Sequence, residues 1–291
     1  MKPARCVAIA GGTHGNEFTG IYLVKKFERN PALIQRNTFQ TVTLLGNPEA
    51  FAIARRYVET DLNRCFLPND LHDPTLTRYE EKRAKEIQRQ LTGSDPSVEM
   101  IIDLHTTTAN MGLTLILVNH HPFNLALAAY LSQINPAVQI YSAYQPNKPN
   151  AFLNSLCDLG FAIEVGAIAQ GTLNANLFQQ TESLVLSILD AVEQFNQGTL
   201  QTPHSVTIHQ HLRTVDYPKS DRGEIIGMIH PNLQNRDYHP LHPGDPIFLL
   251  FDGGAIAYSG DTTVYPIFIN EAAYYEKGIA LCLTQRQQIT W

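Results

Sequence analysis

The first two thirds of the chain alternate between short apolar runs and longer segments with helical periodicity. Short apolar runs that end in glycine, proline or polar residues are typical of buried strands, whereas apolar residues recurring every three to four positions predict amphipathic helices. The pattern predicts strands over 5–12, 38–48, 99–108, 113–120 and 161–168, and helices over 17–30, 78–91, 123–135 and 176–198. Strands alternating with helices predict an α/β fold with a mixed or mostly parallel sheet flanked by helices.

The pattern changes at about residue 199. A linker-like stretch, "TLQTPHS", is followed by short strand-like segments separated by turn sequences such as "HPGDP", "FDGG" and "YSGD". Helical periodicity is nearly absent beyond this point. We therefore predict two domains: an α/β domain over residues 1–200 and a smaller β domain over residues 201–291.

Composition narrows the class of protein. The 291-residue chain has a net charge of −6 and no basic run of the kind that tracks nucleic acid. It has no apolar run of roughly 18 residues that could span a bilayer, and its first apolar run is shorter than a typical signal core. The cysteines, which form no C-x-x-C pair, are Cys6, Cys65, Cys157 and Cys282. We expect a cytoplasmic protein with reduced thiols that binds neither membrane nor nucleic acid.

The segment "GGTHGNE" after the first predicted strand places His14 three residues before Glu17. Its glycines do not have the G-x-G-x-x-G spacing of a dinucleotide site, and the G-K-[ST] of a phosphate-binding loop is absent. Ligand sites of open α/β sheets lie at the carboxyl ends of strands, and imidazole and carboxylate both bind zinc. The alternative is a loop histidine followed by a carboxylate that faces a helix dipole.

A second polar strand end favours the metal site. The apolar strand "EMIIDLHTTT" carries Asp103 and His105 near its carboxyl end, at the same predicted sheet edge as His14. Two histidines and Glu17 make the three-ligand set of a catalytic zinc with an open fourth position. Asp103 points to the same side of the strand as His105, so it either braces a ligand imidazole or caps the strand end.

Glu164 is the third polar residue of this kind, within the apolar strand "GFAIEVGA". A lone carboxylate there is unfavourable unless it is paired or used. Burial would raise its pKa and suit it to take a proton from water at the metal. The alternative is a buried ion pair with an arginine.

A cluster of basic residues and a pair of histidines are further candidates for function. Arg56 and Arg64 flank Asn63 in "RRYVETDLNRCF". Guanidinium groups grip carboxylates, so this cluster in a net-negative protein is consistent with an anionic substrate; the alternative, which is the more common case for loop arginines, is a solvated surface loop. His209 and His211 alternate along a predicted strand. They could form a metal pair, but a solvated strand face is the preferred interpretation.

Together these motifs resemble the aspartoacylase and succinylglutamate desuccinylase family of zinc-dependent amidohydrolases, which have a zinc-carboxypeptidase-like fold. The resemblance is greatest to the aspartoacylases. It spans nearly the whole chain in order, through "GGTHGNE", "NPEA", "TDLNR", "IDLHTTTANMG", "AIEVG", "VDYP", "IHPNLQ", "LHPGDP" and "INEAAYYEK".

The resemblance implies a role for each matched residue. The implied zinc ligands are His14, Glu17 and His105; the implied general base is Glu164, and the arginine that polarises the scissile carbonyl is Arg56. The residues implied to hold the substrate carboxylate are Asn63, Arg64 and Tyr274. One departure concerns Asn154, ten residues before Glu164, where aspartoacylases carry an arginine for the second carboxylate of aspartate. Nearby, only Lys148 offers a cation.

We therefore predict an enzyme with one zinc ion per chain that hydrolyses small anionic N-acyl-L-amino acids, with the β domain covering the pocket. The leading substrate is N-acetyl-L-aspartate, which would yield L-aspartate and acetate. The alternatives are N-acyl aromatic amino acids or succinylglutamate as substrates, and a non-catalytic zinc-binding module. Assembly into a homo-oligomer stays open.

Overall fold

The computed structural model describes residues 3–93 and 95–291. Its strands are β1 (Cys6–Gly11), β2 (Gln40–Leu45), β3 (Met100–Thr106), β4 (Gly112–Leu117), β5 (Val138–Ser142), β6 (Leu159–Gly166), β7 (Ser205–Asp216), β8 (Gly227–Ile229), β9 (Pro246–Leu250), β10 (Ala255–Ala257), β11 (Tyr265–Ile267) and β12 (Ile279–Thr290). Its α-helices are α1 (Phe18–Arg29), α2 (Pro48–Ala52), α3 (Pro68–His72), α4 (Tyr79–Thr92), α5 (Pro122–Ile134) and α6 (Ala175–Asn196). Short 3-10 turns are η1 (Pro31–Leu33), η2 (Leu62–Arg64), η3 (Leu153–Leu156) and η4 (Ala272–Lys277).

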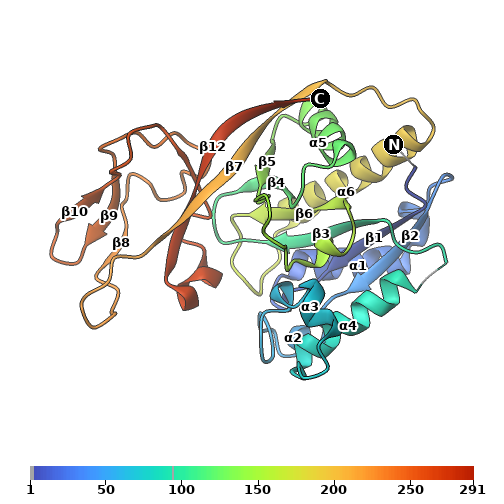
Figure 1. Ribbon diagram of the computed structural model, residues 1–291, viewed down its shortest axis with the longest axis horizontal. Coiled ribbons are helices and arrows are strands. Elements are labelled where there is room, and N and C mark those ends of the chain that lie inside the picture. Colours follow the sequence, from blue (N-terminus) through green and yellow to red (C-terminus); the bar gives the residue numbers. More distant parts are fainter. Residues whose placement is uncertain (1–2, 94) are drawn as a thin grey trace.

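A large mixed sheet forms the centre of the molecule (Figure 1). Within the described residues it has nine strands in the order β11-β12-β7-β5-β4-β6-β3-β1-β2. Strands β2, β1, β3 and β6 are parallel to one another, and β4 runs antiparallel to β6. Because β1, β3 and β6 are adjacent and parallel, their carboxyl ends meet at one edge of the sheet.

Helices cover both faces of this sheet. Apolar residues of α1, α5 and α6 pack on one face against side chains such as Ile9 and Ile102. On the other face, α4 packs with residues of the 61–71 segment against Cys6, Ala8 and Ala10. Neighbouring residues of β1 therefore face different cores, as expected for a strand buried on both sides.

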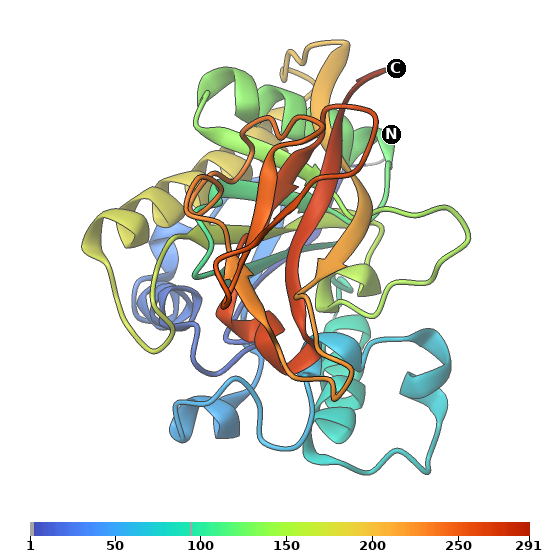
Figure 2. The same ribbon diagram turned by 90° about the vertical axis from the view of Figure 1, so that its left-hand side faces the viewer.

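Residues beyond 204 contribute to two sheets. Strands β7, β11 and β12 extend the large sheet, whereas β8, β9 and β10 form a separate three-stranded sheet within the described chain. The small sheet lies at the far end of the long β7–β12 ribbon (Figure 1), and the ribbon faces the viewer in Figure 2. The predicted fold class, a mixed sheet flanked by helices with a smaller C-terminal β region, is confirmed.

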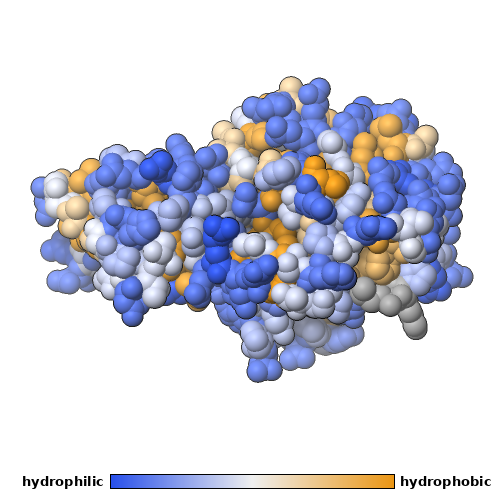
Figure 3. Space-filling view, turned by 90° about the horizontal axis from the view of Figure 1, so that it is seen from above, coloured by the Kyte–Doolittle hydropathy of each residue, from blue (hydrophilic) through white to orange (hydrophobic). Residues whose placement is uncertain are grey.

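Each strand and helix predicted for the first two thirds of the chain is present, with ends within a few residues. Strand β5, only five residues long, was not predicted. The surface in Figure 3 is mainly hydrophilic with small separate apolar spots. No helix among the described residues is long and apolar enough to cross a bilayer.

Candidate active site

Three buried side chains converge at the carboxyl ends of β1 and β3. His14 follows β1, Glu17 immediately precedes α1, and His105 lies in β3. His14 Nδ1 is 2.6 Å from Glu17 Oε1, His105 Nδ1 is 3.0 Å from Glu17 Oε2, and the two Nδ1 atoms are 3.2 Å apart. In the described part of the chain, this is the one group of three potential metal-ligating side chains whose ligand atoms all lie within 4.8 Å of one another.

A close backbone contact positions the loop that carries His14. At Gly15 a Cβ atom would lie 2.2 Å from the carbonyl carbon of Ala50, so only glycine allows this approach. The backbone nitrogen of Gly15 also donates a hydrogen bond to the carbonyl oxygen of Arg56 at 3.0 Å. The loop is thus held against the segment that supplies Arg56.

Two further carboxylates contact the Nε2 atoms of His14 and His105, on the side of each ring away from Glu17. Asp61 Oδ1 lies 3.0 Å from His14 Nε2, and Asp103 Oδ2 lies 2.7 Å from His105 Nε2. A carboxylate in this position fixes the orientation and the tautomer of a metal-ligating histidine. The Asp103 contact is the one expected if Asp103 braces His105. Asp61 lies in the motif "TDLNR", but nothing in the local pattern of the sequence predicts its contact with His14.

The chemistry of this donor set suits a divalent cation. His14 Nδ1 and His105 Nδ1 lie 3.2 Å apart, near the spacing of about 3.3 Å between ligands of tetrahedral zinc, and each lies within 3.0 Å of one oxygen of Glu17. Burial alone would raise the pKa of Glu17, but the imidazoles of His14 and His105 hold that pKa well below its usual range. Two further carboxylates, Asp61 and Asp103, add negative charge that a cation would neutralise.

Glu164 lies directly opposite His105 in the parallel register of β3 and β6. It is half-buried and lines a cavity of about 110 Å³ that also contains His14, Glu17 and His105. Burial raises the pKa of Glu164 well above its usual value, and the charge of Glu17 raises it further. Among the described residues, no arginine forms an ion pair with Glu164 within 4.0 Å, so the structure gives no support to the ion-pair alternative.

Arg56 enters the cavity beside the same carboxylates. Its Nη1 is 3.2 Å from Glu17 Oε1, and its Nη2 is 3.3 Å from Asp61 Oδ2. The side chain is 16% exposed, and its Nε atom is buried without a hydrogen-bond partner in the described chain. Arg56 therefore brings a fixed positive charge to the wall of the cavity.

Asn63, Arg64 and Tyr274 also line this cavity. The Asn63 side-chain oxygen accepts a hydrogen bond from the backbone nitrogen of Leu153 at 2.9 Å, and its amide nitrogen lies 3.5 Å from His105 Nε2. The Arg64 guanidinium lies 4.9 Å from the centre of the Phe152 ring. Tyr274 comes from η4, so the C-terminal region contributes to the cavity.

Glu271 is a second residue that sequence reasoning missed. Its buried carboxylate accepts hydrogen bonds from the Thr107 hydroxyl and from both the nitrogen and the hydroxyl of Thr108. Its other oxygen accepts from the nitrogen of Ala273 at 2.9 Å. The contact ties the turn that carries Tyr274 to the end of β3. The only signal in the sequence was its place in "INEAAYYEK".

Two residues singled out for the second carboxylate of a substrate differ in position. Asn154 lies in η3, is 1% exposed, and is not among the described residues that line the cavity. Neither polar atom of its side chain has a hydrogen-bond partner in the described chain. Lys148, in contrast, lines an outer cavity that adjoins the inner one.

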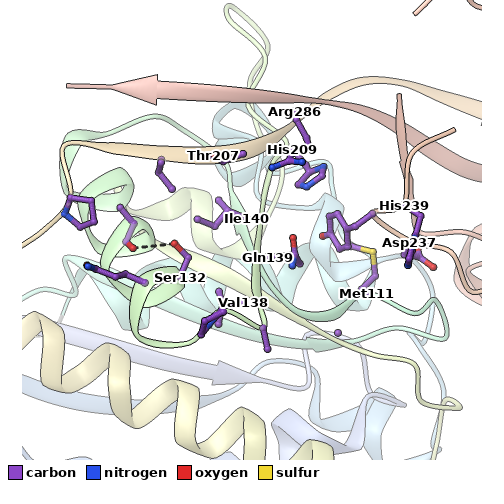
Figure 4. A pocket seen from close by; sticks show the side chains of 18 of the residues that line it. Met111, Ser132, Val138, Gln139, Ile140, Thr207, His209, Asp237, His239 and Arg286 are labelled. Atoms are coloured by element: carbon purple, nitrogen blue, oxygen red, sulfur yellow. Dashed lines mark hydrogen bonds between the residues drawn. The ribbon is translucent and has the colours of Figure 1, made fainter. Parts of the chain in front are cut away.

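A larger cavity, of about 810 Å³, lies elsewhere, and none of the proposed site residues is among the described residues that line it (Figure 4). His209 lines it and is only 6% exposed, so the preferred interpretation of a solvated histidine face is wrong for this residue. The rings of Tyr238 and Tyr265 cover His209, with ring-centre distances of 4.7 and 5.4 Å. We therefore assign the chemistry to the smaller cavity, because the titratable groups converge there.

Comparison with known families agrees with this site. Residues 3–192 match the succinylglutamate desuccinylase/aspartoacylase catalytic domain, and residues 204–286 match the AstE/AspA barrel-sandwich hybrid domain. The chain therefore belongs to the succinylglutamate desuccinylase/aspartoacylase family, as the motifs predicted.

Individual relatives refine this placement. The chain is 57% identical over 99% of both sequences to a protein of Trichodesmium erythraeum named "Probable aspartoacylase". It is 41% identical to an N-acyl-aromatic-L-amino acid amidohydrolase of Rattus norvegicus, over 99% of this chain and 93% of the relative. The crystal structure of murine aminoacylase 3 superposes with a TM-score of 0.94 at 40% identity and covers 100% of this chain and 98% of that one.

Proposed function

We propose that this protein is a zinc-dependent amidohydrolase that removes the acyl group from N-acyl-L-amino acids, with N-acetyl-L-aspartate as the leading substrate. The observation that carries the proposal is the pairing of His105 with Glu164 across β3 and β6, which sets a half-buried carboxylate beside the His-Glu-His group in one cavity. The names of the relatives support the same class of reaction.

One zinc ion per chain would be held by His14, Glu17 and His105. When bound, zinc would polarise the amide carbonyl and lower the pKa of water to roughly 7. Asp61 and Asp103 would keep the two imidazoles oriented through their outer nitrogens.

Glu164 would move the proton. A carboxylate whose pKa is raised by burial is a suitable base near neutral pH. It would take a proton from the attacking water and deliver it to the nitrogen of the leaving amine. Arg56, whose guanidinium lines the same cavity, would stabilise the negative charge that develops on the carbonyl oxygen.

Asn63, Arg64 and Tyr274 would hold the substrate's α-carboxylate. In this proposal residues 1–200 supply the metal site, and residues 201–291 cover it and contribute Tyr274. Cytoplasmic location is part of the proposal and is supported by the four free cysteines, Cys6, Cys65, Cys157 and Cys282.

N-acyl aromatic amino acids are the second candidate substrates. Aromatic and apolar side chains, including Tyr141, Phe152 and Phe268, line part of the cavity. An amidohydrolase for such substrates is 41% identical to this chain. A non-catalytic zinc-binding module is disfavoured, because such a protein has no need for an unpaired Glu164 beside the metal-ligating group.

Metal analysis combined with kinetics tests the proposal. The purified protein should contain about one zinc per chain, and chelation should abolish hydrolysis until zinc is restored. The zinc-loaded protein should release the amino acid from N-acetyl-L-aspartate, N-acetyl-L-tyrosine or N-succinyl-L-glutamate. A metal-free active enzyme would refute the metal assignment, and a zinc-loaded protein inactive on the whole panel would refute the activity.

A further inference from the structure

Glu80 is a fully buried carboxylate in a helix whose other charged residues reach solvent. It is the second residue of α4, and its side chain is 0% exposed. Among the described residues, no lysine, arginine or histidine forms an ion pair with it within 4.0 Å. A buried carboxylate without a counter-charge is unfavourable unless hydrogen bonds satisfy it. The hydrogen-bond partners of Glu80 therefore explain why the fold keeps a charge there.

Four hydrogen bonds satisfy this carboxylate. Glu80 Oε1 accepts from the backbone nitrogen of Val58 at 2.6 Å and from the side-chain nitrogen of Asn47 at 3.0 Å. Its Oε2 accepts from the backbone nitrogens of Glu59 at 3.1 Å and Thr60 at 3.0 Å. Three successive backbone N–H groups that point at one anion form a nest, which is a strong binding site for a carboxylate. One side chain of α4 therefore fixes the shape of a separate loop.

This loop supplies two residues of the candidate active site. Arg56 lies just before the three N–H groups that Glu80 holds, and Asp61 lies just after them. Arg56 contacts both Glu17 and Asp61, and Asp61 contacts the outer nitrogen of His14. Glu80 itself is not among the described residues that line the inner cavity. Any effect of Glu80 on the site must therefore pass through the loop.

The loop has few other constraints on its shape. Residues 53–61, between α2 and η2, form neither helix nor strand. Asn47, which donates to Glu80, also caps α2 by accepting a hydrogen bond from the nitrogen of Ala50 at 3.1 Å. The backbone nitrogen of Asn47 donates to the carbonyl oxygen of Gly12 at 2.8 Å. Asn47 and Glu80 thus connect the loop to the segment that follows β1 and carries the first metal-ligating residues.

We propose that Glu80 is a positioning residue for the hydrolytic site, because its carboxylate sets the loop that holds Asp61 against His14 and Arg56 against Glu17. This inference rests on the proposed zinc-dependent hydrolysis and adds to it a residue outside the cavity. A displaced Asp61 would no longer orient His14, so zinc affinity should fall. A displaced Arg56 would no longer face the charge that develops on the carbonyl oxygen, so kcat should fall while KM changes little.

Glu80→Gln tests the proposal with little change in side-chain volume. The amide keeps one acceptor oxygen but turns an N–H₂ group towards N–H donors, so part of the nest is lost. Zinc affinity, measured by competition with a chromophoric chelator, should fall about tenfold. At saturating zinc, kcat for N-acetyl-L-aspartate should also fall about tenfold, with KM nearly unchanged. The control Glu28→Gln changes an exposed carboxylate of α1 and should alter neither quantity.

A double-mutant cycle separates positioning from a general loss of stability. If Glu80 acts on zinc binding through Asp61, Glu80→Gln should lower zinc affinity less than twofold in the Asp61→Asn background, where the orienting carboxylate is already gone. Losses of zinc affinity that add in the double variant would overturn the inference. So would a Glu80→Gln protein that unfolds more easily but keeps the zinc affinity and kcat of the wild type.

Hydrogen exchange tests the same contact without metal or turnover. In the metal-free protein, the backbone amides of Val58, Glu59 and Thr60 should exchange at least about tenfold faster in Glu80→Gln than in the wild type, while amides of α1 keep their rates. Equal exchange at these three amides would overturn the inference even if the hydrolytic activity stands. A wild-type protein that neither binds zinc nor hydrolyses the substrate panel would refute the proposed function, and exchange alone would then decide whether Glu80 positions the loop. Asn47→Ser, which keeps a capping oxygen for α2 and removes only one donor to Glu80, should show the same changes at smaller size and serves if Glu80→Gln does not fold.

Discussion

The Glu271 carboxylate accepts hydrogen bonds from the backbone nitrogen of Thr108 at 2.7 Å and from its hydroxyl at 2.9 Å, and so joins η4 to the end of β3. Glu271→Ala would leave these partly buried donors and the buried Thr107 hydroxyl without their acceptor, so we expect a loss of about 2–4 kcal/mol in the free energy of unfolding. Catalytic efficiency should also fall, because Tyr274 loses its anchor. Chemical denaturation measures the change in stability, and steady-state kinetics measures the change in kcat/KM. Glu28→Ala, which removes an exposed carboxylate of α1, should have little effect on stability.

Asp61 and Asp103 should control metal affinity. Replacing either by asparagine removes the carboxylate that holds a ligand imidazole, which typically weakens metal binding about 10–100-fold. Competition with a chromophoric chelator measures the zinc affinity directly. Asp221→Asn, a change at an exposed aspartate in the turn after β7, is the matched control. Zinc affinity unchanged in both Asp61→Asn and Asp103→Asn would mean that these contacts do not orient the ligands.

Glu164→Gln should separate catalysis from structure. The carboxamide keeps the shape of the side chain but cannot accept the proton, so turnover should fall by a factor of about 10² to 10⁴. Zinc content and thermal stability should stay close to those of the wild-type protein. If Glu164 were instead a structural residue, the variant would unfold more easily and its folded fraction would keep the original rate.

His209 should make stability depend on pH. Burial and the nearby charge of Arg286 lower its pKa to about 4 in the folded protein. Between about pH 6.5 and pH 4 the His209 imidazole is protonated in the unfolded chain but neutral in the folded protein. The folded state should therefore lose up to about 3 kcal/mol as the pH falls from 6.5 to 4.

Denaturation at a series of pH values measures this loss as the difference between the wild-type protein and His209→Phe. Arg286→Gln keeps the imidazole and removes the charge, so the folded pKa should move upward and the loss should shrink. A His209→Phe protein with the same pH dependence as the wild type would contradict the prediction.

Asn154 should tolerate an apolar residue better than a charged one. Its amide is buried without partners in the described chain, so Asn154→Leu should raise the free energy of unfolding by about 1 kcal/mol. Asn154→Arg should destabilise the protein by about 3 kcal/mol or more, because it buries an unpaired charge. A stable Asn154→Arg protein with a sharper preference for N-acetyl-L-aspartate would instead show that this position faces the substrate.

The sequence predicted those parts of the site that follow from local pattern. His14, His105 and Glu164 each interrupt or follow an apolar strand, and adjacent parallel strands place such residues at one edge. Asp61 gave no comparable signal, because it precedes a short 3-10 turn in an irregular segment. Its role depends on how that segment folds back onto the loop of His14.

Long-range pairing accounts for what the local pattern missed. The alternation of His209 and His211 predicted a solvated face, but rings from Tyr238 and Tyr265 cover His209. The joining of β7 to β5 over two residue pairs also has no local signature. Burial in these places is decided by residues far away in the chain.

The β7–β12 ribbon limits which segments of this enzyme can be exchanged with those of a relative. Strand β7 pairs with β12 along Ser205–Asp216 and with β5 on its other edge, so the region matched to the hybrid domain also closes one side of the catalytic sheet. A chain ending near residue 200 would expose the edge of β5 to other molecules. A functional chimera between relatives would therefore need to transplant the ribbon together with the strand it docks on.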